Sequence, residues 1–120
     1  MTNYLGLIHD ATELRKLIAE NPDLPIVVIA GEEVNNGDSY YWMYCSSVSA
    51  QIEEILDARL PFDDERVFSD REMFEEAIAD HLNDKETENL SEEDFDALAK
   101  TEIAKYKPYW RKVIAVYVDN

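Results

Sequence analysis

The sequence predicts an α+β fold, in which a small sheet of three or four strands packs with three or four helices. Three observations support this prediction. Two runs of apolar, β-branched residues, 25–30 and 112–118, are typical of buried strands. Two later segments, starting at Ser69 and Ser91, combine helix-capping residues with apolar residues at helical spacing. Because the 120 residues contain no repeat, low-complexity tract or long linker, we expect one domain, 1–120.

The first predicted elements are a helix and a strand. Apolar residues recur at helical spacing within 10–20, and Asp10 is placed to cap that helix. Asn21-Pro22 would end it, since the residue before a proline disfavours helical geometry. The run 25–30 is bounded by a proline and a glycine, which suits a strand buried on both faces.

The segment from 26 to 68 is predicted to form a hairpin, a helix and a short edge strand. Asn36-Gly37 tolerates positive φ, so we expect a turn between strands at 26–33 and 39–46. Apolar residues within 48–56 recur at helical spacing and predict a helix, although so short a stretch also fits a strand. Residues 65–68 are expected to pair as a short edge strand.

The second half of the chain predicts two capped helices and a final strand. Ser69 and Glu72 form a capping box at the start of the first helix. Its buried face is predicted to comprise Met73, Phe74, Ala77, Ile78 and Leu82. Ser91 caps a second helix that extends to about Tyr106. Residues 112–118 are almost wholly apolar, which indicates a central strand.

Acidic residues are concentrated in the middle of the chain. The 44 residues 53–96 hold 18 of the 27 Asp and Glu but 4 of the 11 Lys and Arg. They account for −14 of the net charge of −16, whereas a domain of this size is soluble with a net charge of roughly 2 to 8. The imbalance favours a basic partner. It disfavours direct binding to nucleic acid or to an anionic membrane, which would repel the chain.

The helix predicted after Ser69 holds more carboxylates than helix polarity explains. Acidic residues stabilise a first turn, which accounts for 92–94 in the next helix. In this helix they continue beyond the first turn, and pairs four residues apart, such as Glu72 with Glu76, repel each other. Their spacing of about 6 Å along the axis resembles that of successive phosphates on a nucleic-acid strand. The candidate partner-binding residues are Glu72, Glu75, Glu76, Asp80, Asp84, Glu86 and Glu88.

Two other interpretations remain open. The carboxylates could form a solvated face that serves solubility only. Tyr40, Trp42 and Tyr44 alternate along their predicted strand, so an aromatic sheet face could instead form a partner contact or a homodimer seam. Salt separates these interpretations, because a complex between opposite charges weakens as ionic strength rises and an aromatic contact does not.

The sequence contains no catalytic, metal or cofactor motif. His9 and His81 lack zinc-binding spacing and are expected at the surface or its boundary. Cys45 falls in an apolar strand pattern, which predicts a buried free thiol in a reducing compartment. There is no secretion signal and no apolar run of membrane-spanning length. We therefore expect a non-enzymatic, cytoplasmic protein that needs no metal or cofactor and inserts in no membrane.

Three segments, 14–27, 40–43 and 110–118, resemble a family of small acidic proteins of uncharacterised function. Such proteins are carried by bacteriophages and integrated mobile elements of Gram-positive bacteria. The resemblance implies a setting in which small acidic proteins block host defences, including anti-CRISPR and anti-restriction proteins, several of which mimic nucleic acid. It implies no catalytic residue. The expected partner is thus a basic, nucleic-acid-binding host protein such as a Cas effector.

Overall fold

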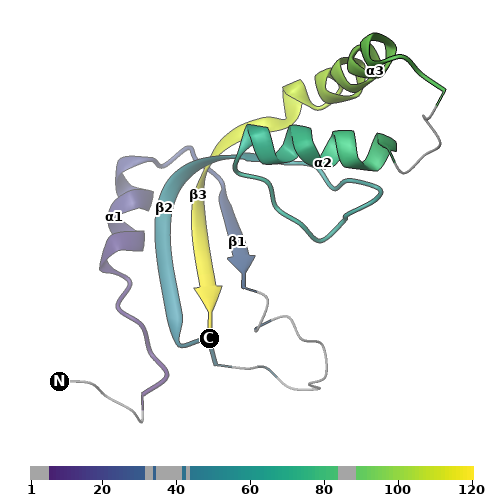
Figure 1. The fold of residues 1–120 in the computed structure, drawn as a ribbon. Helices are drawn as coiled ribbons and strands as arrows, with labels where there is room; N and C mark the ends of the chain where they lie inside the picture. Colours follow the sequence, from purple (N-terminus) through teal and green to yellow (C-terminus); the bar gives the residue numbers. More distant parts are fainter. Residues whose placement is uncertain (1–5, 32–33, 35–41, 43, 84–88) are drawn as a thin grey trace. The chain divides into compact units, whose positions relative to one another are not determined.

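The computed structural model describes residues 6–31, 34, 42, 44–83 and 89–120 (Figure 1). In these residues the chain forms three α-helices and a three-stranded mixed sheet, which confirms the predicted α+β class. The elements in chain order are α1 (Thr12–Glu20), β1 (Ile26–Ala30), β2 (Ser47–Leu56), α2 (Arg71–Asn83), α3 (Glu92–Ala104), a 3₁₀ turn (Lys107–Tyr109) and β3 (Trp110–Asp119).

The chain divides into two compact units. The first comprises Met1–Glu53 and Lys112–Asn120, and the second comprises Glu54–Arg111. Strands β2 and β3 contribute residues to both, so the chain passes twice from one unit to the other. That the whole chain behaves as one domain stays a prediction, which unfolding experiments can test.

In the first unit, β3 is the central strand of the sheet, as predicted. The strand order is β1-β3-β2, and β1 runs parallel to β3 with Ile26 opposite Ile114 and Val28 opposite Val116. Backbone hydrogen bonds extend this pairing to Pro25, whose carbonyl accepts from Ile114 N–H at 2.9 Å. Residues 113–116 are all buried. An apolar, β-branched run therefore marks the middle of the sheet correctly.

The prediction that the first strand is buried on both faces is wrong. Burial alternates along β1, with Ile26 51% and Val28 63% exposed. In-register neighbours project from the same face of a sheet, so Val28 lies on the same face as its partner Val116, which is buried. That face is covered at the centre of the sheet but not at β1. The composition of a strand predicts its burial only when its place in the sheet is known.

The chain between β1 and α2 was predicted to contain a hairpin strand and a helix. The expected hairpin strand at 39–46 falls largely outside the described residues, and Trp42, Tyr44 and Cys45, which are described, lie in no strand. The predicted helix over 48–56 is wrong, because these residues belong to β2, the alternative that the sequence left open. Their β-branched side chains suit the pleated surface that β3 offers.

The predicted edge strand at 65–68 is also wrong. These residues have no strand geometry and lie in the connection between β2 and α2. The Phe68 carbonyl accepts one backbone hydrogen bond, from Leu56 N–H at 2.9 Å. This bond holds the segment while the Phe68 side chain enters the core of the second unit. Phe68 is therefore apolar because its ring is buried in this core, and not because the segment pairs with a strand of the sheet.

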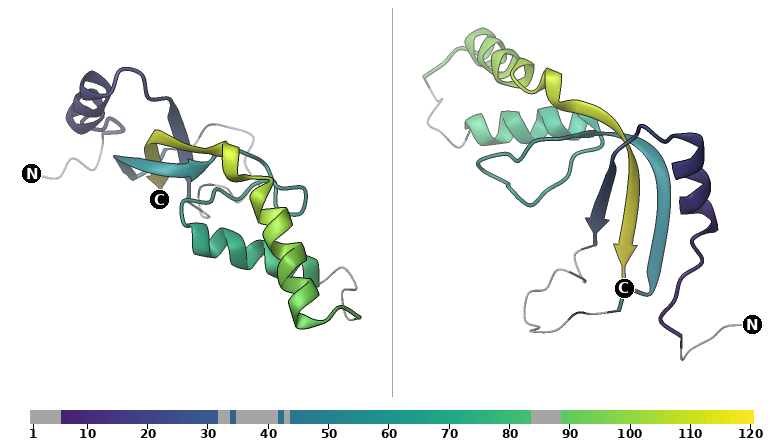
Figure 2. Two further views of the ribbon diagram at one scale, coloured as in Figure 1. Left: turned by 90° about the horizontal axis from the view of Figure 1, so that it is seen from above. Right: turned by 180° about the vertical axis from the view of Figure 1, so that it is seen from behind.

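The core of the second unit forms around Phe74 of α2, which is 1% exposed. Its ring makes edge-to-face contacts with Phe68, Tyr106 and Trp110 at centroid distances of 5.6, 5.4 and 5.8 Å. The other buried members of this cluster are Leu56, Leu60, Ile78 and Leu82. Helix α3 packs against α2 and adds partly buried side chains to the cluster, among them Phe95, Leu98 and Ile103 (Figure 2).

The buried face of α2 is narrower than predicted. Phe74, Ile78 and Leu82 are buried and recur every four residues, while Ala77 packs against their edge. Met73 was predicted in this face but is 50% exposed. A step of one residue turns a helix by about 100°, which carries Met73 away from the stripe that begins at Phe74.

The cap of α2 differs from the prediction, whereas that of α3 confirms it. Asp70 Oδ1 accepts hydrogen bonds from the backbone N–H groups of Glu72 and Met73, at 2.8 and 3.2 Å, and the helix begins at Arg71. Ser69, the predicted cap, lies one residue too early. In α3, Ser91 Oγ accepts from Asp94 N–H at 3.1 Å, as predicted.

Replacing Asp70 by alanine is expected to lower the free energy of unfolding by about 1 kcal/mol, because two backbone N–H groups lose their acceptor. Ser69→Ala is the matched control and should change that free energy by less than about 0.5 kcal/mol. Urea denaturation followed by far-ultraviolet circular dichroism measures both. Equal losses for the two variants would show that Asp70 is not the cap.

Candidate functional site

Four of the candidate partner-binding residues form an exposed surface on α2, which we call the α2 ridge. They are Glu72, Glu75, Glu76 and Asp80. All four side chains are exposed, and none forms an ion pair with a residue that the structure describes. The remaining candidates, Asp84, Glu86 and Glu88, lie outside the described residues.

The ridge occupies the side of α2 that faces away from the core. Glu72, Glu76 and Asp80 each precede a buried residue by two positions, and two positions correspond to about 200° around a helix. Their side chains therefore project almost opposite the stripe of Phe74, Ile78 and Leu82. Burial of one face of α2 forces the other toward solvent, and the carboxylates follow each other at about 6 Å along the axis.

Arg71, the cation nearest to the ridge in sequence, does not neutralise it. Helical spacing would allow it to pair with Glu75 one turn along. Instead, Arg71 Nη2 lies 2.6 Å from Glu54 Oε1, and the guanidinium stacks over the Trp110 ring at 4.5 Å from its centroid. Stacking on the Trp110 ring together with pairing to the Glu54 carboxylate of β2 stabilises the guanidinium more than pairing with a single exposed carboxylate on the same helix. Arg71 therefore leaves the charge of the ridge uncompensated.

The other ion pairs among described side chains lie away from the ridge. Lys105 Nζ contacts Glu102 Oε1 at 2.6 Å, and Arg111 Nη1 contacts Asp57 Oδ2 at 3.4 Å. Both pairs are largely exposed, and such pairs contribute at most about 1 kcal/mol. They involve cations from the end of α3 and the start of β3, and no ion pair among the described residues involves a carboxylate of the α2 ridge.

His9 lies beside Cys45, an arrangement that would suit a cysteine nucleophile only if the imidazole met the thiol. The contact is to the backbone: His9 Nε2 lies 2.7 Å from the Cys45 carbonyl oxygen. Among the described residues, no hydrogen bond reaches the Cys45 sulfur, and the thiol is half-buried. His81 stacks on Phe62 at 4.0 Å between centroids and is also half-buried. Both histidines thus lie at the boundary of the surface, as predicted.

The aromatic residues do not gather on one described sheet face. Tyr106 and Trp110 pack in the second unit around Phe74. In the first unit, Tyr44 stacks on His9 at 5.9 Å, and the Tyr117 hydroxyl donates to the Glu53 carboxylate. Trp42 is fully exposed, and Tyr40 lies outside the described residues. Most of the described aromatic side chains therefore have partners within their own unit.

The described part of the chain contains no group of three or more His, Cys, Asp and Glu residues placed to hold a metal ion. None of its helices has the length and apolar character needed to cross a membrane. A small cavity between α1 and the sheet was missed by sequence reasoning, because Val48 and Val116, which line it, are far from α1 in the chain.

Comparison with known proteins assigns no family to this chain. No protein-family model matches it, and no curated protein or solved structure matches it significantly.

Proposed function

We propose that this protein binds a basic, nucleic-acid-binding protein through the α2 ridge and thereby blocks it. The observation that supports this proposal is the row of exposed carboxylates opposite the buried stripe of α2, none of which pairs with a cation that the structure describes. The proposed setting is a bacteriophage or mobile element, and the proposed target is a host defence nuclease such as a Cas effector. The protein would act without catalysis, in the cytoplasm, as a mimic of the nucleic-acid backbone.

The energetics of the ridge favour a cationic partner. Glu72 with Glu76, and Glu76 with Asp80, are like-charge pairs four residues apart, each of which costs a few tenths of a kcal/mol. Lys and Arg side chains placed between them would turn this repulsion into attraction. Proteins that bind nucleic acid hold such cations in rows, which they use to neutralise phosphates. A carboxylate row at helical spacing can occupy the same groove.

The decisive variant is Glu76→Lys with Asp80→Lys, tested for inhibition of DNA cleavage by a panel of Cas effectors and restriction nucleases. Both side chains are exposed and form no ion pair with a described residue, and Asp80 lies in the last turn of α2, where a cation is favourable, so the fold should be retained. We expect the wild-type chain to inhibit one nuclease of the panel and the variant to lose at least about a hundredfold in potency, as expected for two charge-reversed contacts.

The matched control reverses two exposed carboxylates of the first unit, Glu20→Lys with Asp23→Lys. It changes the net charge equally, so it should inhibit like the wild type if the position of the charge matters. Equal loss in both variants would show that only net charge counts. Inhibition of no nuclease in the panel would contradict the proposed target.

Salt provides an independent measurement on the same complex. We expect affinity to fall by at least about a hundredfold between 50 and 200 mM salt, as it does for proteins that contact several phosphates. A complex whose affinity is unchanged over this range would favour the alternative, an assembly or partner contact through exposed aromatic residues. Trp42 would then be the side chain to replace, because it is fully exposed.

A further inference from the structure

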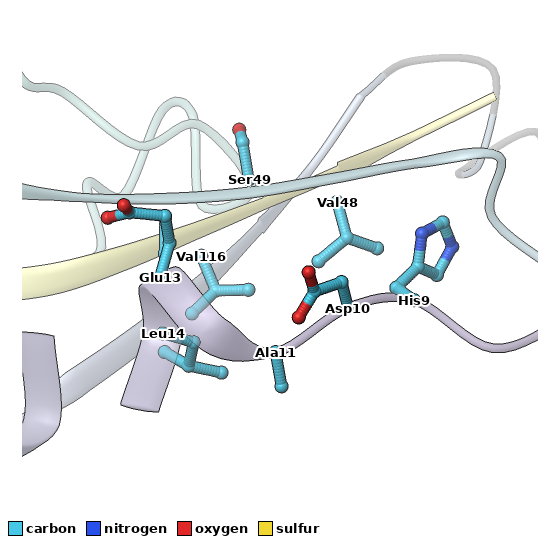
Figure 3. A pocket seen from close by; sticks show the side chains of 9 residues that line it. His9, Asp10, Ala11, Glu13, Leu14, Val48, Ser49 and Val116 are labelled. Carbon is cyan, nitrogen blue, oxygen red and sulfur yellow. The ribbon is translucent and has the colours of Figure 1, made fainter. Parts of the chain in front are cut away.

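The first unit contains a cavity of about 90 Å³ between α1 and the sheet (Figure 3). Its floor is apolar and consists of Ala11, Leu14, Val48, Ala50 and Val116. Its polar side chains are those of His9, Asp10 and Glu13, whereas the Ser49 side chain points away from α1 on the other face of β2 (Figure 3). The cavity lies in the first unit, whereas the α2 ridge lies in the second, so a ligand of the cavity does not depend on the proposed function of the ridge.

The Asp10 carboxylate is held in place by the start of α1. Its Oδ1 accepts from the backbone N–H and the hydroxyl of Thr12, at 2.9 and 2.5 Å. These bonds hold the pKa of Asp10 below its usual value, so the group is charged at neutral pH. Its second oxygen, Oδ2, accepts no hydrogen bond from a described residue. Figure 3 shows this carboxylate directed toward the sheet beside Val48.

The second carboxylate at the cavity is also available to accept hydrogen bonds. Glu13 has no hydrogen-bond or ion-pair partner among the described side chains. Since a carbonyl oxygen can only accept, His9 Nε2 donates to the Cys45 carbonyl. The lining therefore offers two carboxylates beside an apolar floor, and it would repel an anion.

We propose that this cavity binds a primary ammonium group on an unbranched aliphatic chain, such as a lysine side chain or a small free alkylamine. An ammonium has three donors and no acceptor, which matches the lining. A cavity of about 150 Å³ holds benzene, so 90 Å³ has room for a narrow chain of about four carbons rather than a ring. The methylenes contact the apolar floor while the charged end meets Asp10 and Glu13.

The test is a titration of the isotope-labelled full chain, followed by amide resonances in NMR. The probes are n-butylammonium, methylammonium and n-butyrate, with Nα-acetyl-lysinamide as the model of a lysine side chain. We expect n-butylammonium to shift amides of 9–14, 48–50 and 116. It should bind at least about tenfold more tightly than methylammonium, because each buried methylene contributes about fourfold. Butyrate should shift none of these amides.

Variants of the chain distinguish binding of the ammonium in this cavity from its general attraction to an acidic protein. Asp10→Asn removes the charge but keeps an acceptor for Thr12, and it should weaken n-butylammonium binding at least about tenfold. Glu20→Gln, on the same helix but outside the cavity, is the control and should bind like the wild type. Ala50→Leu fills the floor and should lower the affinity for n-butylammonium to that for methylammonium.

Three results would overturn the proposal. They are equal affinities for methylammonium and n-butylammonium, equal effects of Asp10→Asn and Glu20→Gln, or shifts centred on the α2 ridge. Binding of Nα-acetyl-lysinamide as tight as that of n-butylammonium would identify a lysine side chain as the occupant. Binding of n-butylammonium alone would identify a free amine, and either outcome supports the same chemistry.

Discussion

Replacing Phe74 by alanine is expected to lower the free energy of unfolding by about 3 to 5 kcal/mol. Phe74 is 1% exposed and its ring contacts Phe68, Tyr106 and Trp110, which come from three different segments of the second unit. Alanine removes the buried apolar surface, leaves a cavity and abolishes three edge-to-face ring contacts. A loss of this size is a large part of the stability of a small protein, which is typically 5 to 15 kcal/mol.

Urea denaturation followed by far-ultraviolet circular dichroism measures this loss. Met73→Ala is the matched control, since Met73 is the neighbouring residue on α2 but is half-exposed, and it should cost less than about 1 kcal/mol. Phe74→Leu retains part of the buried volume and should fall between the two, which keeps the test usable if the alanine variant does not fold. Equal losses at positions 73 and 74 would contradict the described core.

Replacing Ile114 by alanine is expected to have the second largest effect, a loss of about 2 to 5 kcal/mol. Ile114 is 1% exposed in the central strand β3, opposite Ile26 of β1. Its neighbours Val113 and Ala115 are also buried, so both faces of β3 are covered at this point and the loss of the Ile114 side chain removes buried apolar surface. Val28→Ala, at a 63% exposed position of β1, is the control and should cost less than about 1 kcal/mol.

These two variants together test whether the chain is a single domain. Residue-resolved NMR can follow urea unfolding at Ile78 in the second unit and at Val116 in the first. If 1–120 is one cooperative domain, Phe74→Ala and Ile114→Ala will each lower the midpoint at both residues. If the units unfold separately, each variant will lower the midpoint only in its own unit, and the single-domain prediction will be wrong.

Elements with strong local signals were predictable from the sequence. The hydroxyl of Ser91 caps α3 as predicted, because capping depends on residues within one turn. The central strand β3 was recognised because a long, wholly apolar run has few alternatives to burial. The cap of α2 was misplaced by one residue, since Ser69 and Asp70 are both good capping residues and only the geometry of the entering chain selects between them.

Elements whose identity depends on distant partners were not predictable. Residues 47–56 have apolar residues that fit either a helix or a strand, and pairing with β3 decides the matter. The burial of β1 was overestimated because its sequence resembles that of a central strand, although it has a neighbour on one side only in the described sheet. From helical spacing Arg71 could pair at most with Glu75, but Glu54 and Trp110 are reached only once the chain has folded.

The sequence by itself determined how much negative charge this protein carries, which segment holds it, and the α+β class, because composition and local periodicity are properties of the chain. The tertiary structure alone decided which carboxylates have no ion-pair partner in the part of the chain that is described. Burial of Phe74, Ile78 and Leu82 turns the α2 ridge outward, and stacking on Trp110 draws Arg71 away from it. The tertiary structure also creates the cavity lined by Asp10 and Val116, since residues 106 positions apart become neighbours only by folding.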